Sequence, residues 1–219
     1  MIAVVDYKKG NLKSVERGLV AAGADARITD NPDVIGAAHG IVLPGVGAFA
    51  DTASTMESLG QMEVVRERVL AGVPFLGICL GMHLMFEEGT ETHPGDTSGG
   101  AHRGLGILPG VVDAMPRVGE DGRNYKIPHV GWNSIEPVRG SDFNCELLAG
   151  VKPGEYFYFT HSYAAPATEA TVAIASHSIA IPSVVRYRDV AFGVQFHPEK
   201  SSDAGTCVLR NFVRIVKEA

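Results

Sequence analysis

Short unbroken hydrophobic runs alternate with stretches of helical periodicity along the first half of the chain. Runs of this kind predict strands that are buried on both faces, and apolar residues three or four positions apart predict helices. The predicted strands are Ile2–Asp6, Ala24–Ile28, Gly40–Leu43 and Phe75–Ile78, and the predicted helices are Asn11–Ala22, Thr52–Ala71 and Leu80–Glu88. Strands that alternate with helices indicate right-handed crossovers and a parallel sheet of the α/β class.

The second half of the chain has more strand-like stretches and fewer helices between them. We therefore expect this half to add antiparallel strands to the sheet. Thr92–Arg103 is rich in Gly, His and Pro and predicts an exposed loop or insertion. Asp203–Lys217 predicts a closing helix with Asp203 as its N-cap. The predicted strand-like stretches are Leu105–Met115, Val130–Val138, Tyr156–Tyr163, Thr171–Ser176 and Ser183–Phe196.

The composition limits the classes of protein to which the chain can belong. The chain has 219 residues, 45% of them hydrophobic, and no internal linker, which predicts a single domain over residues 1–219. A net charge of −6 argues against binding to nucleic acid or to an anionic membrane. No apolar run reaches the roughly 18–20 residues of a membrane span, and the first residues predict a strand instead of a leader. Three scattered cysteines fit neither a disulfide framework nor a zinc site, which favours a reducing cytoplasm.

The string Gly77-Ile78-Cys79-Leu80-Gly81 joins a predicted strand to a predicted helix. This spacing is typical of a nucleophile elbow, a sharp turn that exposes its central residue in a strained conformation. At the start of a helix, the dipole and the free N–H groups favour a thiolate, and the Leu80 N–H can donate to an oxyanion. The competing interpretation is a buried cysteine at a strand end, which describes most free cysteines.

His197 and Glu199 follow an apolar strand-like stretch and are separated by Pro198. Residues two apart in an extended segment point to the same side, so the Glu199 carboxylate can orient the His197 ring. Such an imidazole can take a proton from a thiol and return one to a leaving group. The competing interpretation is a histidine at a strand end followed by a solvated glutamate. Ordinary histidines in polar contexts are present elsewhere, at His93, His102 and His177.

The turn Pro44-Gly45-Val46-Gly47-Ala48-Phe49 directly follows another predicted buried strand. Its glycines allow backbone N–H groups to face a ligand, as an oxyanion hole requires. Pro-Gly alone is only a turn signal, but open α/β sheets bind ligands at the carboxyl ends of their strands. We therefore expect this turn, Cys79 and His197 to meet at one sheet edge.

Several strings together resemble one enzyme family. Gly77–Met82, Pro44–Gly47 and His197–Ser201 resemble the triad-type (class I) glutamine amidotransferases. Asp6-Tyr7 with Gly10-Asn11, Pro128–Asn133 and Tyr156–Tyr163 are similar to strings in the glutaminase subunits of imidazole glycerol phosphate synthases, from histidine biosynthesis. The resemblance runs from Val4 to the last predicted helix. It implies a mostly parallel central sheet with a flavodoxin-like core, flanked by helices and extended by antiparallel strands.

The resemblance also implies a reaction without a metal or other cofactor. Cys79 would attack the side-chain amide carbon of L-glutamine, and His197, oriented by Glu199, would protonate ammonia and then activate water against a γ-glutamyl thioester. The oxyanion would be held by the Leu80 N–H and by an N–H of the Val46-Gly47 turn, which in this family can reorient. Glu91, on its own a surface charge, is implied at the substrate's α-amino group and Ser162-Tyr163 near its α-carboxylate. The implied substrate-binding residues are Gly45, His83, Glu91, Ser162 and Tyr163.

A partner is implied as well. In the family, ammonia passes, shielded from water, to a (β/α)₈ cyclase subunit in a heterodimer, because ammonium is not a nucleophile. Residue types alone do not require an interface, since an isolated Trp or Tyr is more often a packing residue, although aromatic residues are enriched at interfaces. The implied interface residues are Asn11, Trp132, Tyr156, Tyr158, Lys200 and Ser202.

Two positions depart from the family pattern, and three alternatives stay open. His83 stands where the family usually has Gln, and Lys8 where it often has Gly after Asp-Tyr. The alternatives are the glutaminase subunit of another amidotransferase, a cysteine peptidase or other hydrolase, and a non-catalytic binding module. Peptidases of the papain type use Asn in place of Glu199, which speaks against the second. The presence of all three triad side chains speaks against the third.

Overall fold

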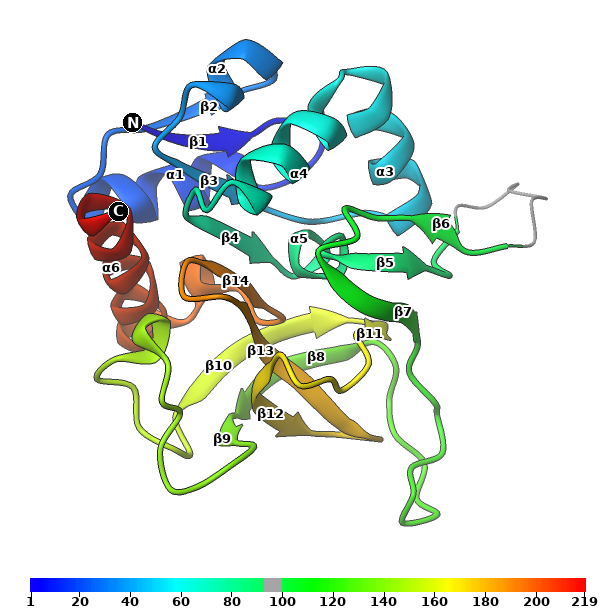
Figure 1. Cartoon of the computed structure of the whole chain (residues 1–219). Helices are drawn as coiled ribbons and strands as arrows, with labels where there is room; N and C mark the ends of the chain where they lie inside the picture. The colour runs from blue at the N-terminus through cyan, green and yellow to red at the C-terminus, as the bar shows by residue number, and fades with distance from the viewer. Residues whose placement is uncertain (93–99) are drawn as a thin grey trace.

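The computed structural model describes residues 1–92 and 100–219, and its centre is an eight-stranded sheet (Figure 1). The strand order is β2-β1-β3-β4-β14-β13-β12-β9. The first five strands run parallel, and the last three are added antiparallel, which confirms the predicted mixed α/β sheet. The strands are β1 (Ile2–Val5), β2 (Ala26–Thr29), β3 (Gly40–Leu43), β4 (Phe75–Ile78), β9 (Glu136–Pro137), β12 (Thr171–Ser176), β13 (Ala180–Tyr187) and β14 (Ala191–Val194).

Helices cover both faces of the parallel part, and residue alternation along the strands assigns each face its own core. Val4 packs with Leu19 and Phe212, under α1 and α6, whereas its neighbour Val5 packs with Met56 and Val65, under α3 and α4. The helices are α1 (Leu12–Ala21), α2 (Pro32–Gly36), α3 (Phe49–Ser58), α4 (Gln61–Leu70), α5 (Leu80–His83) and α6 (Ser202–Glu218), with short 3₁₀ turns at Glu146–Leu148 and Pro198–Lys200.

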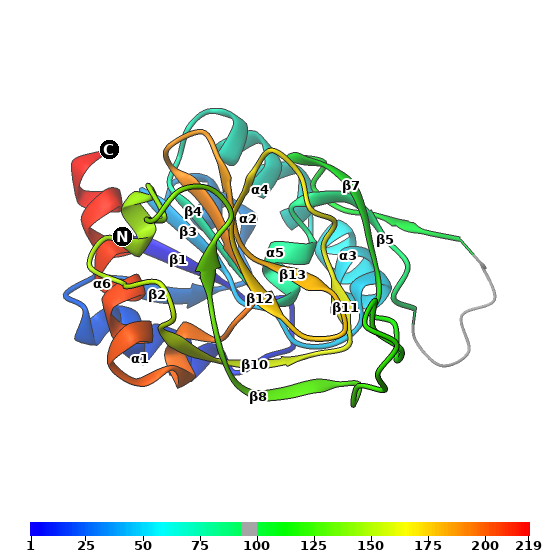
Figure 2. The same cartoon turned by 90° about the horizontal axis from the view of Figure 1, so that it is seen from below.

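Two smaller sheets stand beside the main one. The strands β8 (His129–Ser134) and β10 (Tyr156–His161) pair antiparallel, and they run side by side along one edge of the molecule in Figure 2. A four-stranded sheet of order β11-β7-β5-β6 lies beyond the helix α5. Its strands are β5 (Phe86–Gly89), β6 (His102–Arg103), β7 (Leu108–Ala114) and β11 (Tyr163–Ala164).

The predicted helix Leu80–Glu88 is wrong in its second half. The helix α5 ends at His83, and Phe86–Gly89 forms the strand β5. The Leu84 carbonyl accepts the Leu105 N–H at 2.7 Å, so its backbone group is used by a distant segment and not by the next helical turn. Pairing of β5 with β6 and β7 therefore overrides local helix preference.

Other elements also differ from the prediction, and the stretches 130–138 and 156–163 are each divided into two strands. The stretch 52–71 is two helices, because Gly60 adopts a left-handed φ of +67° between them, and 183–196 belongs to a hairpin of β13 and β14. Asp203 lies in the first turn of α6 and does not cap it. The short helix α2 was not predicted, although Asn31 before Pro32 is an N-cap signal, and the Asn31 side chain accepts the Asp33 N–H at 2.8 Å. Residues 93–99 of the predicted loop Thr92–Arg103 lie outside the described residues.

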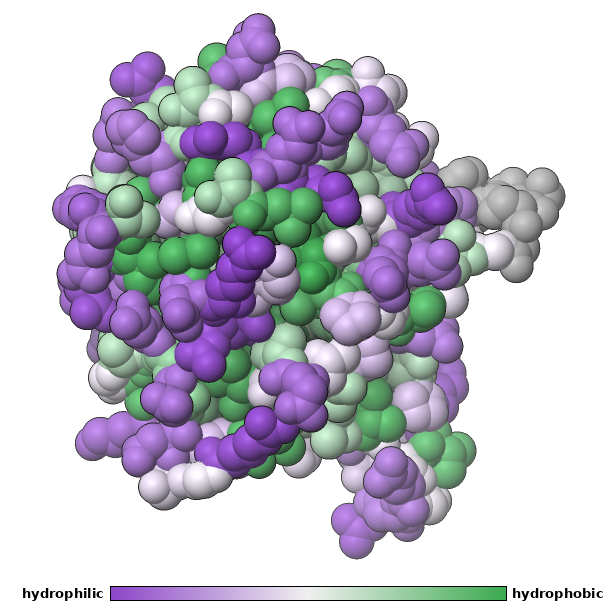
Figure 3. All heavy atoms as spheres, viewed as in Figure 1, coloured by the Kyte–Doolittle hydropathy of each residue, from purple (hydrophilic) through white to green (hydrophobic). Residues whose placement is uncertain are grey.

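Hydrophilic residues cover most of the outline of the face shown in Figure 3, and hydrophobic residues show mainly in its middle. Within residues 1–92 and 100–219, no helix has the length and apolar character needed to cross a membrane. Three exposed hydrophobic side chains are close to one another on the paired strands β8 and β10, namely Val130, Trp132 and Tyr156.

Candidate active site

Cys79 occupies a strained turn between the strand β4 and the helix α5. Its φ of +52° is rare for a residue with a side chain, and it precedes the first residue of α5. The flanking glycines are required by close approach: a Cβ on Gly77 would lie 2.5 Å from the Gly81 oxygen, and one on Gly81 would lie 1.8 Å from the Leu43 oxygen. The turn therefore has the backbone geometry that a nucleophile elbow requires.

His197 reaches the same sheet edge because β14 lies beside β4. The Cys79 N–H donates to the Val194 carbonyl at 2.7 Å, which holds the two loops together. His197 Nδ1 lies 2.9 Å from Glu199 Oε1, and both side chains are only 3% exposed. Burial lowers the pKa of His197, but the neighbouring Cys79 and Glu199 outweigh burial and raise this pKa to about 9.

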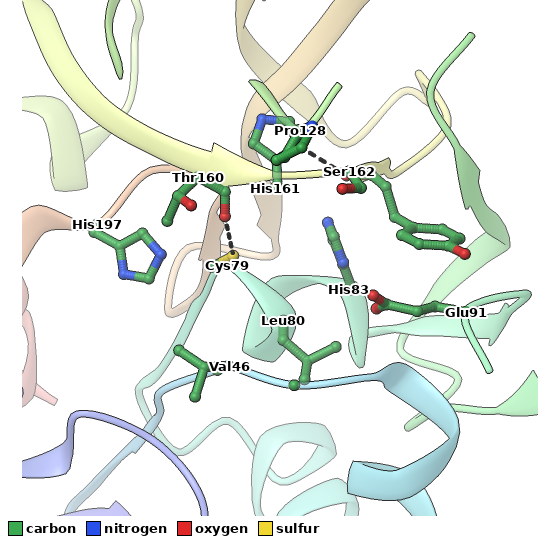
Figure 4. A pocket seen from close by; sticks show the side chains of 13 residues that line it. Val46, Cys79, Leu80, His83, Glu91, Pro128, Thr160, His161, Ser162 and His197 are labelled. Atoms are coloured by element: carbon green, nitrogen blue, oxygen red, sulfur yellow. Dashed lines mark hydrogen bonds between the residues drawn. The ribbon is translucent and has the colours of Figure 1, made fainter. Parts of the chain in front are cut away.

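The thiol is not yet hydrogen-bonded to the histidine. Cys79 Sγ donates to the Thr160 carbonyl at 3.9 Å, as the dashed line in Figure 4 shows. Among the described residues, His197 Nε2 has no hydrogen-bond partner, although it is buried. Catalytic hydrogen bonds are often long or misaligned before a substrate binds, so this geometry is that of a resting site.

Backbone N–H groups around Cys79 differ in their availability for an oxyanion. The Leu80 N–H begins α5 and has no acceptor in the described parts of the chain, and the same is true of the Gly47 N–H. The Val46 N–H, in contrast, donates to the hydroxyl of the buried Tyr7 at 3.0 Å. The oxyanion role of this turn stays a prediction, and in the present conformation the Val46 N–H is directed to Tyr7.

A cavity of about 370 Å³ opens in front of Cys79. This volume lies in the range of small-molecule sites and suffices for a free amino acid. Figure 4 shows Cys79 between His197 and His83, with Val46 and Leu80 on one side and Thr160 on the other. The lining brings together all the predicted substrate and oxyanion residues, which are Gly45, Val46, Gly47, Leu80, His83, Glu91, Ser162 and Tyr163.

The Glu91 side chain lines this site and comes from the segment that directly follows β5. Its Oε2 accepts the Phe49 N–H at 3.3 Å at the start of α3, and its carbonyl accepts the Ala50 N–H at 3.0 Å. Burial raises the pKa of its carboxyl to about 7, against the opposite effect of the Phe49 hydrogen bond. The residue is thus not the simple surface charge that its local sequence predicts.

Histidines that the sequence singled out only as parts of strings form a hydrogen-bonded chain beside the cavity. His129 Nδ1 lies 3.1 Å from His161 Nε2, and His161 Nδ1 lies 2.8 Å from the Tyr163 carbonyl. Mainly through burial, the pKa values fall to about 4 for His129 and about 3 for His161, so both rings are neutral near pH 7. This chain joins β8 to β10 and holds the backbone on either side of Ser162.

The predicted interface residues lie outside this cavity. Trp132 and Tyr158 face each other across the β8–β10 ladder with ring centroids 6.2 Å apart, and Lys200 Nζ lies 5.9 Å from the Tyr158 centroid. Asn11 and Lys200 line a small cavity of about 10 Å³ behind His197 and Glu199. Tyr156 and Ser202 are exposed, and Ser202 has a φ of +49°. A role of these residues in binding a partner stays a prediction.

Lys8 keeps the backbone conformation of a glycine at a position where the family often has one. Its φ is +66°, in the left-handed region. Its ammonium group pairs with Asp30, and its N–H donates to Asp6 Oδ1 at 2.7 Å. The turn at Lys8 therefore has the backbone conformation that a glycine would adopt, and the lysine side chain adds ion pairs at the surface.

Solved structures share this fold at low sequence identity. A crystal structure of a glutamine amidotransferase superposes with a TM-score of 0.70 at 17% identity, over 99% of this chain and 100% of that one. The glutaminase domain of Trypanosoma brucei CTPS with bound acivicin gives a TM-score of 0.63 at 15% identity, over 99% of this chain and 93% of that one. Identities this low support the fold alone.

Sequence relatives are closer. The protein described as imidazole glycerol phosphate synthase subunit HisH of Desulfitobacterium hafniense (strain Y51) is 42% identical over 220 residues, which cover 100% of this chain and 96% of that protein. The subunit HisH of Chloroflexus aurantiacus is 44% identical, over 98% of this chain and 95% of that protein. A family model for glutamine amidotransferase class-I matches residues 3–216. The chain therefore belongs to the class-I glutamine amidotransferase family, among relatives that are HisH subunits of imidazole glycerol phosphate synthase.

Proposed function

We propose that the chain is the glutaminase subunit of an imidazole glycerol phosphate synthase, acting in histidine biosynthesis. The observation that carries the proposal is that one cavity holds Cys79 in an elbow conformation and a buried His197–Glu199 pair. The family match and the full-length HisH relatives support L-glutamine as the substrate and histidine biosynthesis as the pathway. We take residues 1–219 as one catalytic domain, working in the cytoplasm without a metal or other cofactor.

In the proposed reaction, His197 holds the proton of Cys79 as an imidazolium, and the Cys79 thiolate attacks the side-chain amide carbon of glutamine. The tetrahedral oxyanion accepts hydrogen bonds from the Leu80 N–H and from the Val46-Gly47 turn. His197 then protonates the amide nitrogen of the tetrahedral intermediate, the C–N bond breaks, and ammonia leaves behind a γ-glutamyl thioester, while Glu199 stabilises the imidazolium. Water activated by His197 hydrolyses the thioester and releases glutamate.

Five residues would hold the substrate in this scheme. Glu91 faces the α-ammonium group, Ser162 and Tyr163 lie near the α-carboxylate, and Gly45 and His83 complete the wall. The lining supports this orientation, because Glu91 is the only carboxylate among the described residues that line the cavity. Such a pose places the amide end toward Cys79.

The released ammonia would pass to a (β/α)₈ cyclase subunit bound as a heterodimer. Support comes from the HisH relatives, which are described as subunits of a synthase. The exposed aromatic residues Trp132 and Tyr156, with Tyr158, Lys200, Asn11 and Ser202, are the proposed docking surface. Delivery within a complex protects ammonia from protonation, which would make it non-nucleophilic.

Glutamate release from glutamine tests the function directly. The chain is assayed alone and with the cyclase and the ribonucleotide ligand of the cyclase, and release is expected in the complex. No glutamate from the complete complex would overturn the proposal, and cleavage of peptides without glutaminase activity would indicate a peptidase.

The variant Cys79→Ala tests the division of labour between the subunits. It should abolish glutamine-dependent synthesis of imidazole glycerol phosphate, because the thioester cannot form. Ammonia-dependent synthesis by the assembled enzyme should continue, since the cyclase site is unchanged. Loss of both activities would show that the two reactions are not separated as proposed.

A further inference from the structure

Gln195 is a buried residue that lies between the thiol and His83. It directly follows the strand β14 and has no exposed surface. Its Nε2 lies 3.7 Å from Cys79 Sγ, and its Oε1 lies 2.7 Å from His83 Nε2. One amide group therefore contacts both the sulfur atom and the imidazole that borders the cavity.

The reactive form of the site determines which way these hydrogen bonds run. A thiolate has lone pairs and no proton, so the Gln195 amide must present an N–H group to it. The oxygen of the amide then faces His83, and it can only accept a hydrogen bond. His83 Nε2 must therefore carry a hydrogen atom and act as the donor of this hydrogen bond. The pKa of His83 falls to about 4, chiefly through burial, so the ring is neutral and its Nδ1 has a lone pair. Within the described residues, this Nδ1 has no hydrogen-bond partner.

We infer that Gln195 is a further catalytic residue: it donates a hydrogen bond to the Cys79 thiolate, and through His83 it fixes an acceptor toward an N–H group of the substrate. The donation to sulfur is independent of the substrate. The acceptor role of His83 rests on the proposed function, because it assumes an amide substrate such as glutamine. Glutamate, the product, lacks the amide N–H groups that such an acceptor would select.

A pH profile of the thiol can isolate this contact, since its other neighbours stay constant between variants. The titratable groups facing the thiol or its cavity come from several elements: Tyr7 after β1, His83 on α5, Glu91 after β5, His161 on β10, Tyr163 on β11 and His197 with Glu199 after β14.

The first test is the rate of alkylation of Cys79 by iodoacetamide as a function of pH, with peptide mass spectrometry to separate Cys79 from Cys145 and Cys207. In Gln195→Met, which keeps the length but not the N–H, the midpoint of the profile should rise by about one pH unit. The matched control is Gln61→Met. Gln61 is equally buried, donates to the Asp6 and Asp30 carbonyls and does not line the cavity, so the midpoint should not move.

A profile of folded Gln195→Met that coincides with that of the unchanged protein would overturn the inference. Circular dichroism establishes whether the variant is folded. If Gln195→Met does not fold, Gln195→Glu replaces it, because glutamate keeps the shape and the acceptor for His83. A carboxylate next to sulfur should move the midpoint further upward, and an unchanged midpoint there would equally contradict the inference.

Two substitutions of His83 test its acceptor role in the assembled synthase. His83→Gln can donate to Gln195 and still offer an acceptor, so the KM for glutamine should stay within about threefold. His83→Leu should raise the KM about tenfold with a smaller change in kcat, as loss of one hydrogen bond implies. Equal KM values for the two variants would remove this role. Alkylation needs no glutamine, so failure of the glutaminase proposal would leave the Gln195 result standing.

Discussion

The Glu91 carboxyl group changes its charge in the range where the enzyme would work. Its pKa of about 7 comes from partial burial, and an ammonium group of a substrate requires the ionised form. The fraction of carboxylate rises as the pH rises through about 7. We therefore expect the KM for glutamine to fall between about pH 6 and 8, because binding strengthens as Glu91 ionises.

The variant Glu91→Gln provides the comparison. It should have a raised KM that no longer changes over this pH range, and its kcat should change less than its KM. Steady-state kinetics of the assembled synthase at several pH values measures both quantities. If the pH dependence of KM survives in the variant, another group causes it.

The raised pKa of His197 predicts how turnover changes at alkaline pH. With a pKa of about 9, its imidazolium persists through neutral pH and can protonate the amide nitrogen that leaves as ammonia. Because the folded site raises this pKa, the acid form is present below about pH 9 and is lost above it, so turnover should decline there. Glu199→Gln removes a charge that supports the imidazolium, so the decline should begin at lower pH and kcat should fall about 10²- to 10⁴-fold. An unchanged kcat and alkaline limb would exclude Glu199 from the triad.

Among the secondary-structure elements, the strand β10 has a direct connection to the proposed catalytic turn, residues 197–201. The Tyr158 N–H donates to Ser201 Oγ at 3.0 Å, Ser201 Oγ donates to the His197 carbonyl at 2.6 Å, and the His197 N–H donates to the Tyr158 carbonyl at 2.9 Å. Tyr158 is also one of the proposed interface residues. The strand that carries part of the proposed docking surface thus fixes the backbone of His197.

Ser201→Ala tests this connection. It removes two of the three hydrogen bonds and leaves a Tyr158 N–H without its acceptor, which should lower the free energy of unfolding by about 1–3 kcal/mol. Because His197 loses part of its support, kcat for glutamine hydrolysis should fall more than KM changes. Urea unfolding and kinetics measure these effects, with the exposed Ser58→Ala as a control that changes neither. Normal turnover in Ser201→Ala would show that the connection does not position the histidine.

The same elements show how far the sequence could be used for prediction. The strands β1, β3 and β4 were predicted almost to the residue, since a run buried on both faces has a clear pattern. The strand β5 was missed because its partners are distant in sequence, and no local pattern reports a distant partner.

A similar limit applies to the site. The sequence motifs contain most of the residues that line the cavity, because the chemistry needs particular residue types at particular spacings. Tyr7 and Gln195 escaped prediction as contacts, since a buried Tyr or Gln has many structural uses and only three-dimensional proximity to Val46 and Cys79 distinguishes them.

In the whole molecule, three sheets meet around the cavity. The main sheet supplies Cys79 and His197 at the carboxyl ends of β4 and β14, where open α/β sheets bind ligands. The two-stranded sheet contributes Thr160, and the four-stranded sheet contributes Glu91 and Tyr163. The reacting groups and the groups proposed to hold the substrate thus come from different sheets, so the site depends on how the sheets pack together.

This arrangement puts part of the proposed docking surface on the same two-stranded sheet as the cavity residue Thr160. Trp132 on β8 is 51% exposed, and its partner Tyr158 on β10 precedes the cavity residue Thr160 by two positions. A large exposed aromatic side chain is typical of the few residues that dominate the free energy of an interface. Trp132→Ala should therefore weaken binding to the cyclase by about 2 kcal/mol, or roughly 30-fold in Kd.

Isothermal titration calorimetry with the cyclase measures this Kd, and Val111→Ala is the control. Val111 is an exposed hydrophobic residue as well, at 42%, but it lies on β7 and outside the proposed surface. If Trp132 contributes only to docking, saturating cyclase should restore the kcat of Trp132→Ala, because the three hydrogen bonds that link Tyr158, Ser201 and His197 remain in place. A kcat that stays low at saturation would mean that Trp132 also acts on the catalytic turn, and an unchanged Kd would place the cyclase on a different face.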